Sequence, residues 1–495
     1  MNFYTNVYYT GSTILCREYK DGRMQMARQD FSPCLFMPSN KNKKWKTLEG
    51  RSVEPIYFNN IFEMREFRDR YSNVDKFQVY GDIGVEYQYI SDRYGDELEF
   101  DSRKLCIMYL DIETTCENGF PNISNPTEQV TVISTLVGNK KTVFCLGQFK
   151  GSDDVDVYCF NDEKDLLRSF CEHMRHVKPD IISGWNIKFF DIPYLVNRAY
   201  RLLDEKTVSL LSPWGIVKKK KEKDPNDVEH DIVILVGIST MDYYALYKKF
   251  TLVTRESYAL NYIAEIELGK KKLDYSEYES IRDFYTQNFQ KFVEYNLMDT
   301  ILVSELEDKL KLMDLAIAVA YSAGVNFVDV FSQVRTWDSI IYNYLKKKNI
   351  VIPQKKISDK NSQFKGAYVK DPIVGIHDWI ISYDVNSLYP SLIIHLNISP
   401  ETLQSKNFIG KMNINDIIQD KKDSETYRNL QTAKELDFTI AANGTMYSKE
   451  KIGFLADLMD MMYKERKRNK DMAIECEKKL ELVKKEMQKR GLNIT

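Results

Sequence analysis

Apolar and polar positions follow two different periods in the first two thirds of the chain. Residues 1 to about 100 carry short alternating runs, such as residues 4–9, broken by glycine and polar turns. These runs predict a small mixed domain rich in strands. From Leu105 to about Met313, apolar runs alternate with helical patterns. This alternation predicts an α/β domain with a central sheet.

The last third of the chain has a different pattern. Apolar residues at helical spacing predict a helical segment from residue 314 to about residue 352, ending at Pro353. Residues 354–363 are polar and predict a linker. Residues 380–383 predict a buried strand, and the chain from about Gly453 onward predicts one long charged helix.

Composition limits the class of protein without choosing a function. A chain of 495 residues, 43% hydrophobic and 29% charged, is expected to divide into several domains. The net charge of -2 gives no overall attraction to nucleic acid, so phosphate binding would need local clusters such as residues 218–221. Eight cysteines without a C-x-x-C pair predict neither a disulfide framework nor structural zinc. No run reaches the length of a membrane span, so we expect a soluble cytoplasmic protein without membrane contact.

Acidic residues follow the predicted strands and helices of the α/β segment. The apolar run 105–110 leads into Asp111 and Glu113, which share one face of a strand because strand side chains alternate. Asp191 stands where a helix is expected to begin, two residues before Pro193. Taken alone, an Asp-x-Glu after an apolar run is more often a solvated strand end.

A fourth acid, Asp299, lies on a predicted helix over residues 284–310, which places it four residues after Tyr295 on the same face. Four carboxylates and a phenol can then converge. Hard oxygen ligands of this kind suit Mg²⁺ or Mn²⁺. Two such ions about 3.5–4 Å apart would activate a water and stabilise the leaving oxygen of a phosphodiester.

In order and spacing, these residues resemble the motifs of the DEDD exonucleases, in the subclass with tyrosine, which remove nucleotides from a 3′ end. The resemblance implies that Asp111, Glu113 and Asp299 ligate metal directly. It implies that Asp191 does so directly or through water, and that Tyr295 orients the attacking water. Two Mg²⁺ ions are expected in the site, with Mn²⁺ as a substitute.

A second motif covers residues 382–391, where an apolar run ends in Asp384 and a tight turn leads into a helix. Backbone N–H groups at such a turn can hold a triphosphate. The segment resembles the first palm motif of family B DNA polymerases, D-x-x-S-L-Y-P-S. The resemblance implies that Asp384 and the carbonyl of Val385 bind metal, and that Tyr389 excludes ribonucleotides. An Asp ending a core strand beside ordinary turn packing is the plainer alternative.

Further residues gain a role only through the resemblance. Residues 465–470 resemble the fingers helix of T-even-like phage polymerases, whose Arg and Lys clamp phosphates, although such a run is usually a solvated surface. Residues 364–368 partly resemble the Y-x-G-G segment that tracks the template; a simple turn at the glycine is the alternative. The implied DNA contacts are Asn186, Phe190 and Gly366. The implied nucleotide contacts are Ser387, Leu388, Tyr389, Arg466 and Lys470.

The resemblance to T-even-like family B polymerases spans nearly the whole chain and implies an α/β and α+β multidomain fold. Residues 214–237 would form a hairpin that helps to separate primer from template. The implied domains are an N-terminal domain (1–101, completed by 315–355), an RNase H-like 3′-5′ exonuclease domain with a mixed sheet flanked by helices (102–314), a partial palm (356–452) and the start of helical fingers (453–495).

Two motifs of a complete polymerase do not occur in the 495 residues: K-x-x-x-N-S-x-Y-G of the fingers and the Asp-Thr-Asp of the palm. Because two-metal phosphoryl transfer needs both palm acids, we expect that this polypeptide does not polymerise alone. The chain is interpreted as part of a split replicative polymerase, in which a second chain supplies the remaining palm, fingers and thumb. A truncated sequence would look the same.

The expected partners follow from this interpretation. They are primer-template DNA, single-stranded 3′ ends, dNTPs, a C-terminal polymerase chain and, by family analogy, a replisome clamp and a single-strand-binding protein. If a phage encodes the chain, it would act in the host cytoplasm. Two other functions stay open: an autonomous 3′-5′ exonuclease whose palm remnant merely binds DNA, and a non-catalytic nucleic-acid-binding or regulatory module.

Overall fold

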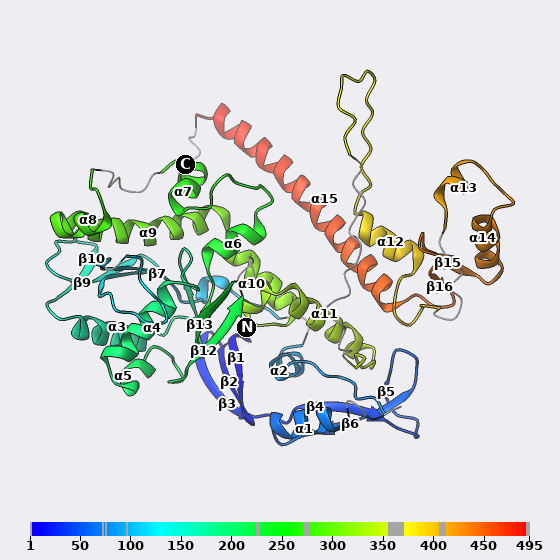
Figure 1. Ribbon diagram of the computed structural model, residues 1–495, viewed down its shortest axis with the longest axis horizontal. Helices are drawn as coiled ribbons and strands as arrows, with labels where there is room; N and C mark the ends of the chain where they lie inside the picture. Colours follow the sequence, from blue (N-terminus) through cyan, green and yellow to red (C-terminus); the bar gives the residue numbers. More distant parts are fainter. Residues whose placement is uncertain are drawn as a thin grey trace. The chain divides into compact units, whose positions relative to one another are not determined.

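The computed structural model describes residues 2–71, 74, 77–95, 98–117, 119–223, 228–270, 277–354, 371–404 and 412–491. The chain forms two compact units (Figure 1). The first comprises Met1–Met37 and Pro55–Asn343, and the second comprises Pro38–Glu54 and Tyr344–Thr495. Within the described ranges, no helix is both long and apolar enough to cross a membrane. All eight cysteines are free thiols.

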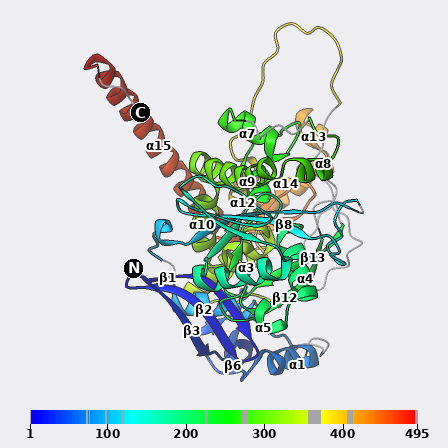
Figure 2. The same ribbon diagram turned by 90° about the vertical axis from the view of Figure 1, so that its left-hand side faces the viewer.

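The chain begins with an antiparallel meander of β1 (Asn2–Thr10), β2 (Thr13–Lys20) and β3 (Arg23–Asp30), seen from two sides in Figures 1 and 2. Asp21 and Gly22 connect β2 to β3 with φ values of 50° and 79°. Positive φ at both central residues matches the right-handed twist of a hairpin. The prediction of a strand-rich start is confirmed by these three strands.

A later segment of the chain packs against the first strand. Beyond α10 (Leu312–Ala323), the carbonyl of Val325 accepts a hydrogen bond from the Tyr4 hydroxyl at 2.7 Å. The side chain of Asn326 accepts from the backbone N–H of Val7 at 2.8 Å and donates to the Val7 carbonyl at 2.9 Å. The Asn326 amide therefore satisfies both backbone groups of Val7.

The central sheet is mixed and six-stranded, in the order β10-β9-β8-β7-β11-β14. Strand β7 pairs antiparallel with β8 and parallel with β11. The buried side chains of β7 are Met108, Tyr109, Leu110, Ile112 and Thr114, a largely apolar run that suits a strand buried on both faces. The strands are β7 (Ile107–Thr114), β8 (Val130–Val137), β9 (Lys140–Leu146), β10 (Val155–Phe160), β11 (Ile181–Ser183) and β14 (Ser239–Thr240).

Helices cover both faces of this sheet (Figure 1). On one face, Phe170 of α3 (Glu163–Val177) and Leu195 of α4 (Asp191–Leu202) join a buried cluster with Met108. On the other, Phe292 of α9 (Phe289–Leu310) packs with Val132. The predicted mixed sheet flanked by helices is confirmed. The remaining helices of this region are α5 (Glu205–Ser209), α6 (Tyr243–Phe250), α7 (Leu260–Leu268), α8 (Ile281–Gln287), η2 (Phe327–Phe331) and α11 (Gln333–Lys347).

A buried ion pair joins the N-terminal meander to the central sheet. Arg17 on β2 lies 3.1 Å from Asp180, and both side chains are almost fully buried. The guanidinium also donates to the carbonyls of Pro179 at 2.7 Å and Gly237 at 2.6 Å. Between β11 and β14, the chain forms the expected hairpin of β12 (Val217–Lys223) and β13 (Glu229–Leu235).

Elsewhere in the N-terminal third, the sheet β4-β6-β5 and two helices complete the fold. These elements are β4 (Cys34–Pro38), β5 (Trp45–Lys46), β6 (Ser52–Tyr57), α1 (Ile61–Tyr71) and α2 (Val85–Arg93), followed by the short helix η1 (Ser102–Lys104).

In the second unit, α12 (Leu388–Leu396) packs against α15 (Phe454–Lys489), the long charged helix that the sequence predicts. The start of α15 is held by the loop after α12, where Asn397 accepts from the Gly453 N–H at 2.8 Å and Glu401 accepts from the Phe454 N–H at 2.6 Å. A carboxylate at a helix N-terminus is favourable because of the helix dipole. The smaller elements are α13 (Ile414–Ile418), α14 (Glu425–Glu435), β15 (Phe438–Ile440) and β16 (Met446–Ser448).

The predicted buried strand at residues 380–383 is wrong. These residues form no strand, and Ile380, Ile381 and Tyr383 are 76%, 73% and 88% exposed. An apolar run becomes a buried strand only when neighbouring strands pair with it and another layer covers it. No strand of the described residues pairs with this run. The predicted linker at residues 354–363 lies, apart from Gln354, outside the described residues.

Candidate functional site

Asp111 and Glu113 lie on the central strand of the sheet. Both side chains belong to β7 and are partly exposed, whereas Ile112 between them is buried on the opposite face. The strand continues through Thr114, so the two acids lie within it and not beyond its end. Their shared face follows from the two-residue period of a strand.

Helix α9 brings further polar groups to this strand. The Nδ2 atom of Asn296 donates to Oδ2 of Asp111 at 2.6 Å. One residue earlier, Tyr295 meets the ring of Phe284 edge-on, with 6.0 Å between ring centroids. Asp299, four residues after Tyr295, is 5% exposed. The helix thus carries both residues predicted from its spacing, together with an amide that directly contacts a strand acid.

Asp191 of helix α4 also contacts strand β7. It is the first residue of α4, it is 4% exposed, and its Oδ1 accepts a hydrogen bond from the backbone N–H of Ile112 at 3.1 Å. The pKa of Asp191 is raised to about 7, chiefly by burial; the Ile112 N–H opposes this rise, and the nearby carboxylates of Asp242 and Asp299 contribute to it. Negative charge is therefore concentrated between β7, α4 and α9.

The turn between β11 and α4 carries the two predicted DNA contacts of this region. Asn186 is exposed and has a φ of 68°. Phe190 stacks on Tyr194 with 5.7 Å between ring centroids, and its ring lies 5.3 Å from that of Phe120. At Gly184 an added Cβ would stand 2.4 Å from the carbonyl oxygen of Leu110, so only glycine lets the turn lie this close to β7.

Asp242, which the sequence analysis does not single out, lies behind this turn. It is the N-cap residue of α6 and is 2% exposed. Burial raises the pKa of Asp242, while backbone donors, including the N–H groups of Asn186 and Lys188, lower it. No local signal marked it, because its contacts join segments more than fifty residues apart.

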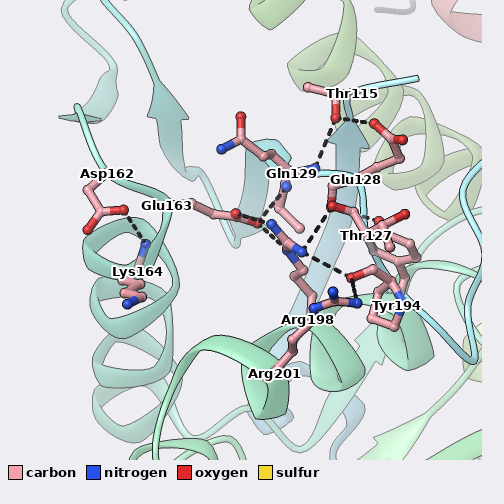
Figure 3. A network of polar contacts seen from close by, with 12 residues as sticks. Thr115, Thr127, Glu128, Gln129, Asp162, Glu163, Lys164, Tyr194, Arg198 and Arg201 are labelled. Atoms are coloured by element: carbon pink, nitrogen blue, oxygen red, sulfur yellow. Dashed lines mark hydrogen bonds and ion pairs between the residues drawn. The ribbon is translucent and has the colours of Figure 1, made fainter. Parts of the chain in front are cut away.

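A network of polar contacts anchors α4 to its neighbours (Figure 3). Glu163 and Arg198 form a buried ion pair at 2.6 Å, and their side chains are 4% and 8% exposed. Glu163 also accepts from the Val130 N–H at 2.8 Å, and Arg198 donates to the carbonyls of Pro126 at 3.0 Å and Thr127 at 3.1 Å. The network ties α3, α4 and the loop before β8 together.

The acidic cluster suits a divalent metal ion by its chemistry. In the part of the chain described, no three or more His, Cys, Asp or Glu side chains are arranged so that they could hold an ion as they stand. The chemistry of the cluster nevertheless fits a divalent cation, because buried carboxylates beside one another gain most from a cation. The raised pKa of Asp191 reflects that burial and repulsion.

The second predicted motif is much more open. Val385 and Tyr389 are 60% and 70% exposed, and Asp384 is also exposed. Ser387 precedes α12 with a φ of 51°, and its hydroxyl accepts a hydrogen bond from Nη1 of Arg466 at 2.9 Å.

The remaining predicted contacts vary in placement. Leu388 begins α12 and is 45% exposed. Lys470 is exposed on α15, one turn after Arg466. Gly366 lies outside the described residues. The structure therefore brings Arg466 to the turn after Asp384 but encloses none of these residues.

Comparison with known proteins defines the class. Residues 67–263 match the exonuclease domain of DNA polymerase family B, and residues 331–494 match DNA polymerase family B itself. The chain therefore belongs to family B of the DNA polymerases.

Within the family, the chain is similar to phage enzymes. It is 29% identical to the DNA-directed DNA polymerase of Escherichia phage RB69, over 99% of this chain and 56% of the relative. It is 28% identical to that of Enterobacteria phage T4, over 98% and 55%. It is also 26% identical to the DNA polymerase delta catalytic subunit of Schizosaccharomyces pombe, over 72% and 33%. The chain thus spans about half the length of the phage relatives.

Proposed function

We propose that this chain removes nucleotides from DNA 3′ ends by metal-assisted hydrolysis of the phosphodiester. The observation that carries the proposal is the buried Asp191, which is bonded to the backbone of Ile112 between the two acids of β7. This contact joins α4 to the strand that carries Asp111 and Glu113. The match to a family B exonuclease domain covers Asp111, Glu113 and Asp191 and ends before Asp299.

Each residue has a defined part in this proposal. Asp111, Glu113 and Asp299 would hold Mg²⁺ directly, with Asp191 direct or through a water, and Mn²⁺ could replace Mg²⁺. Two bound ions would supply an activated water and charge stabilisation at the leaving oxygen. Tyr295 would orient the water.

The substrate strand would be held by other residues. Asn186 and Phe190 would contact it next to the acids, and the β12–β13 hairpin would help to separate primer from template. Asn296 would keep the Asp111 carboxylate in place, since it donates to one of its oxygens.

We further propose that residues 384–389, with Arg466 and Lys470, form one half of a nucleotide-addition site. Asp384 and the Val385 carbonyl would hold metal, and the turn at Ser387 and Leu388 with Tyr389 would hold the dNTP. The Arg466 hydrogen bond to Ser387 supports this grouping. Gly366 would contact the template strand.

Addition of dNTPs needs a second palm carboxylate, which the 495 residues do not supply in an Asp-Thr-Asp motif. We propose that a second chain supplies the remaining palm, fingers and thumb; residues of a longer chain would serve equally. A replisome clamp and a single-strand-binding protein are proposed partners by family resemblance, in a host cytoplasm.

The test is degradation of a labelled single-stranded 3′ end by the purified chain with Mg²⁺, together with dNTP extension of a primed template. Asp111→Ala/Glu113→Ala should abolish degradation. The matched control, Asp154→Ala/Asp156→Ala, removes two acids at the same spacing around the edge strand β10 and should retain it. Absence of degradation by the wild type would contradict the exonuclease proposal, and extension by this chain alone would contradict the need for further residues.

A further inference from the structure

Asp242 makes contacts that a helix cap alone does not need. Its Oδ1 accepts from the backbone N–H groups of Tyr244 at 3.0 Å and Ala245 at 3.4 Å, which are the capping contacts of α6. The same carboxylate also accepts from the N–H of Asn186 at 3.1 Å and, through Oδ2, from the N–H of Lys188 at 3.0 Å. One buried side chain therefore binds two separate segments.

The second of these segments is the turn before α4. Further backbone hydrogen bonds join the same two segments. The Met241 N–H donates to the Ile182 carbonyl, and the Tyr243 N–H donates to the Gly184 carbonyl, both at 2.9 Å. Asn186 stands at the exposed end of the turn with positive φ. Asp191 follows it by five residues, so a shift of the turn would move both side chains relative to β7.

We propose that Asp242 is a positioning residue for 3′-end hydrolysis, which holds the Asn186 turn and, through it, Asp191 in register with β7. The inference rests on the proposed exonuclease function. Asp242 acts without touching substrate: its carboxylate fixes the backbone of the turn, as outer-shell groups fix the residues that bind a metal. Charge-assisted bonds to backbone N–H groups are suited to this task because they are strong and directional.

The alternative is that Asp242 only caps α6, and the chain offers a matched control for it. Asp162 caps α3 through the Lys164 N–H at 3.3 Å, and no contact to the Asn186 turn is among its bonds in the described residues. Asp162→Asn therefore removes a cap charge in the same domain without touching the turn.

The first readout does not depend on activity. Asp242→Asn keeps one acceptor oxygen but places an amide N–H₂ opposite one backbone donor, so backbone hydrogen exchange over residues 184–190 should speed up by about tenfold or more relative to the wild type, with a smaller change over α6. Asp162→Asn should leave residues 184–190 unchanged. Unchanged exchange over 184–190 in Asp242→Asn would overturn the proposal, whether or not the wild type degrades DNA.

The second readout is the kinetics of 3′-end degradation. Because the turn carries a proposed DNA contact and leads to a proposed metal ligand, Asp242→Asn should raise KM and lower kcat, with kcat/KM falling on the order of 10- to 100-fold. A purely structural loss would reduce the active fraction and lower kcat at unchanged KM. That pattern, or unchanged kinetics with faster exchange, would also overturn the proposal. An inactive wild type would instead contradict the exonuclease function itself.

Discussion

The two acidic sites of this chain, around Asp191 and around Asp384, differ in how firmly the surrounding residues hold their side chains. Asp191 is 4% exposed and accepts from the backbone of a neighbouring strand. Asp384 is exposed and follows a segment without strand pairing. Both belong to segments that match family B polymerases. A motif therefore gains a defined geometry only when the elements around it bury its residues and satisfy their polar groups.

The physical difference lies in solvation. Between β7, α4 and α9, carboxylates lose water, and backbone donors and the Asn296 amide replace part of that hydration. At Asp384, water still surrounds the side chain, so nearby charges are screened. The first site therefore stores electrostatic strain that a cation can relieve, whereas the second does not.

The largest expected effect concerns the ion pair that anchors α4, the helix that begins at Asp191. Arg198→Ala leaves Glu163 buried without its cation, which should lower the free energy of unfolding of the central-sheet domain by about 3–5 kcal/mol. Arg168→Ala, which removes an exposed ion pair with Asp165 on α3, should change it by less than about 0.5 kcal/mol. Denaturant-dependent hydrogen exchange of α3 and α4 measures both. Equal effects would show that the network does not support the site.

The second prediction concerns pH and metal. The native pKa of Asp191 is about 7 against an ordinary value of 3.8, so between these values the folded state keeps a proton that the unfolded state has lost. Stability should therefore fall as pH rises from about 4 to 7. Mg²⁺ should counteract the loss near pH 7 by favouring the ionised carboxylate.

Chemical denaturation from pH 4 to 8, with and without Mg²⁺, measures this dependence. Asp191→Asn removes the titrating group and should remove its share of the slope. If the free energy of unfolding of the variant depends on pH as steeply as that of the wild type, a group other than Asp191 causes the dependence.

A third effect is on the rate. Asp191→Asn should slow 3′-end degradation by about 10²–10³-fold, the range found for loss of one preorganised stabilising group. Asp204→Asn, an exposed cap of α5, should not change the rate. Gel-resolved single-turnover degradation measures both. Full activity of Asp191→Asn would show that the buried Asp191 carboxylate does not contribute to hydrolysis.

The smallest effect is expected in the open site. Arg466→Ala removes an exposed hydrogen bond to Ser387 and should change the stability of the second unit by less than about 0.5 kcal/mol. Hydrogen exchange of α12 and α15, recorded as the temperature rises, measures this change in stability. A loss above about 2 kcal/mol would mean that Arg466 holds the turn far more firmly than its exposure suggests.

Local periodicity explains which parts of this molecule were predictable. Asp111 and Glu113 share a face because strands repeat every two residues, and Tyr295 and Asp299 share one because helices repeat every 3.6. Element order and the long helix α15 were predictable for the same reason. The roles of these acids in catalysis stay predictions.

Contacts between distant segments were not predictable. The bonds of Asn296 to Asp111 and of Asp242 to the Asn186 turn connect residues 185 and 56 positions apart, and no spacing rule relates them. The run 380–383 failed for the opposite reason: its composition suits a strand, but no strand of the described residues pairs with it. Sequence patterns report local preference, and partners decide the outcome.

The side-chain bonds of Asn326 to Val7 also set an order of events during synthesis. The Tyr4 hydroxyl and its acceptor, the Val325 carbonyl, are 321 residues apart. At roughly 5–20 residues per second, the ribosome needs on the order of 16–64 s to bridge that distance. Until then, the outer edge of β1 lacks the amide that will cover Val7. The nascent chain therefore offers an open strand edge to other chains for most of its translation, and a chaperone that shields it would raise the yield of folded protein.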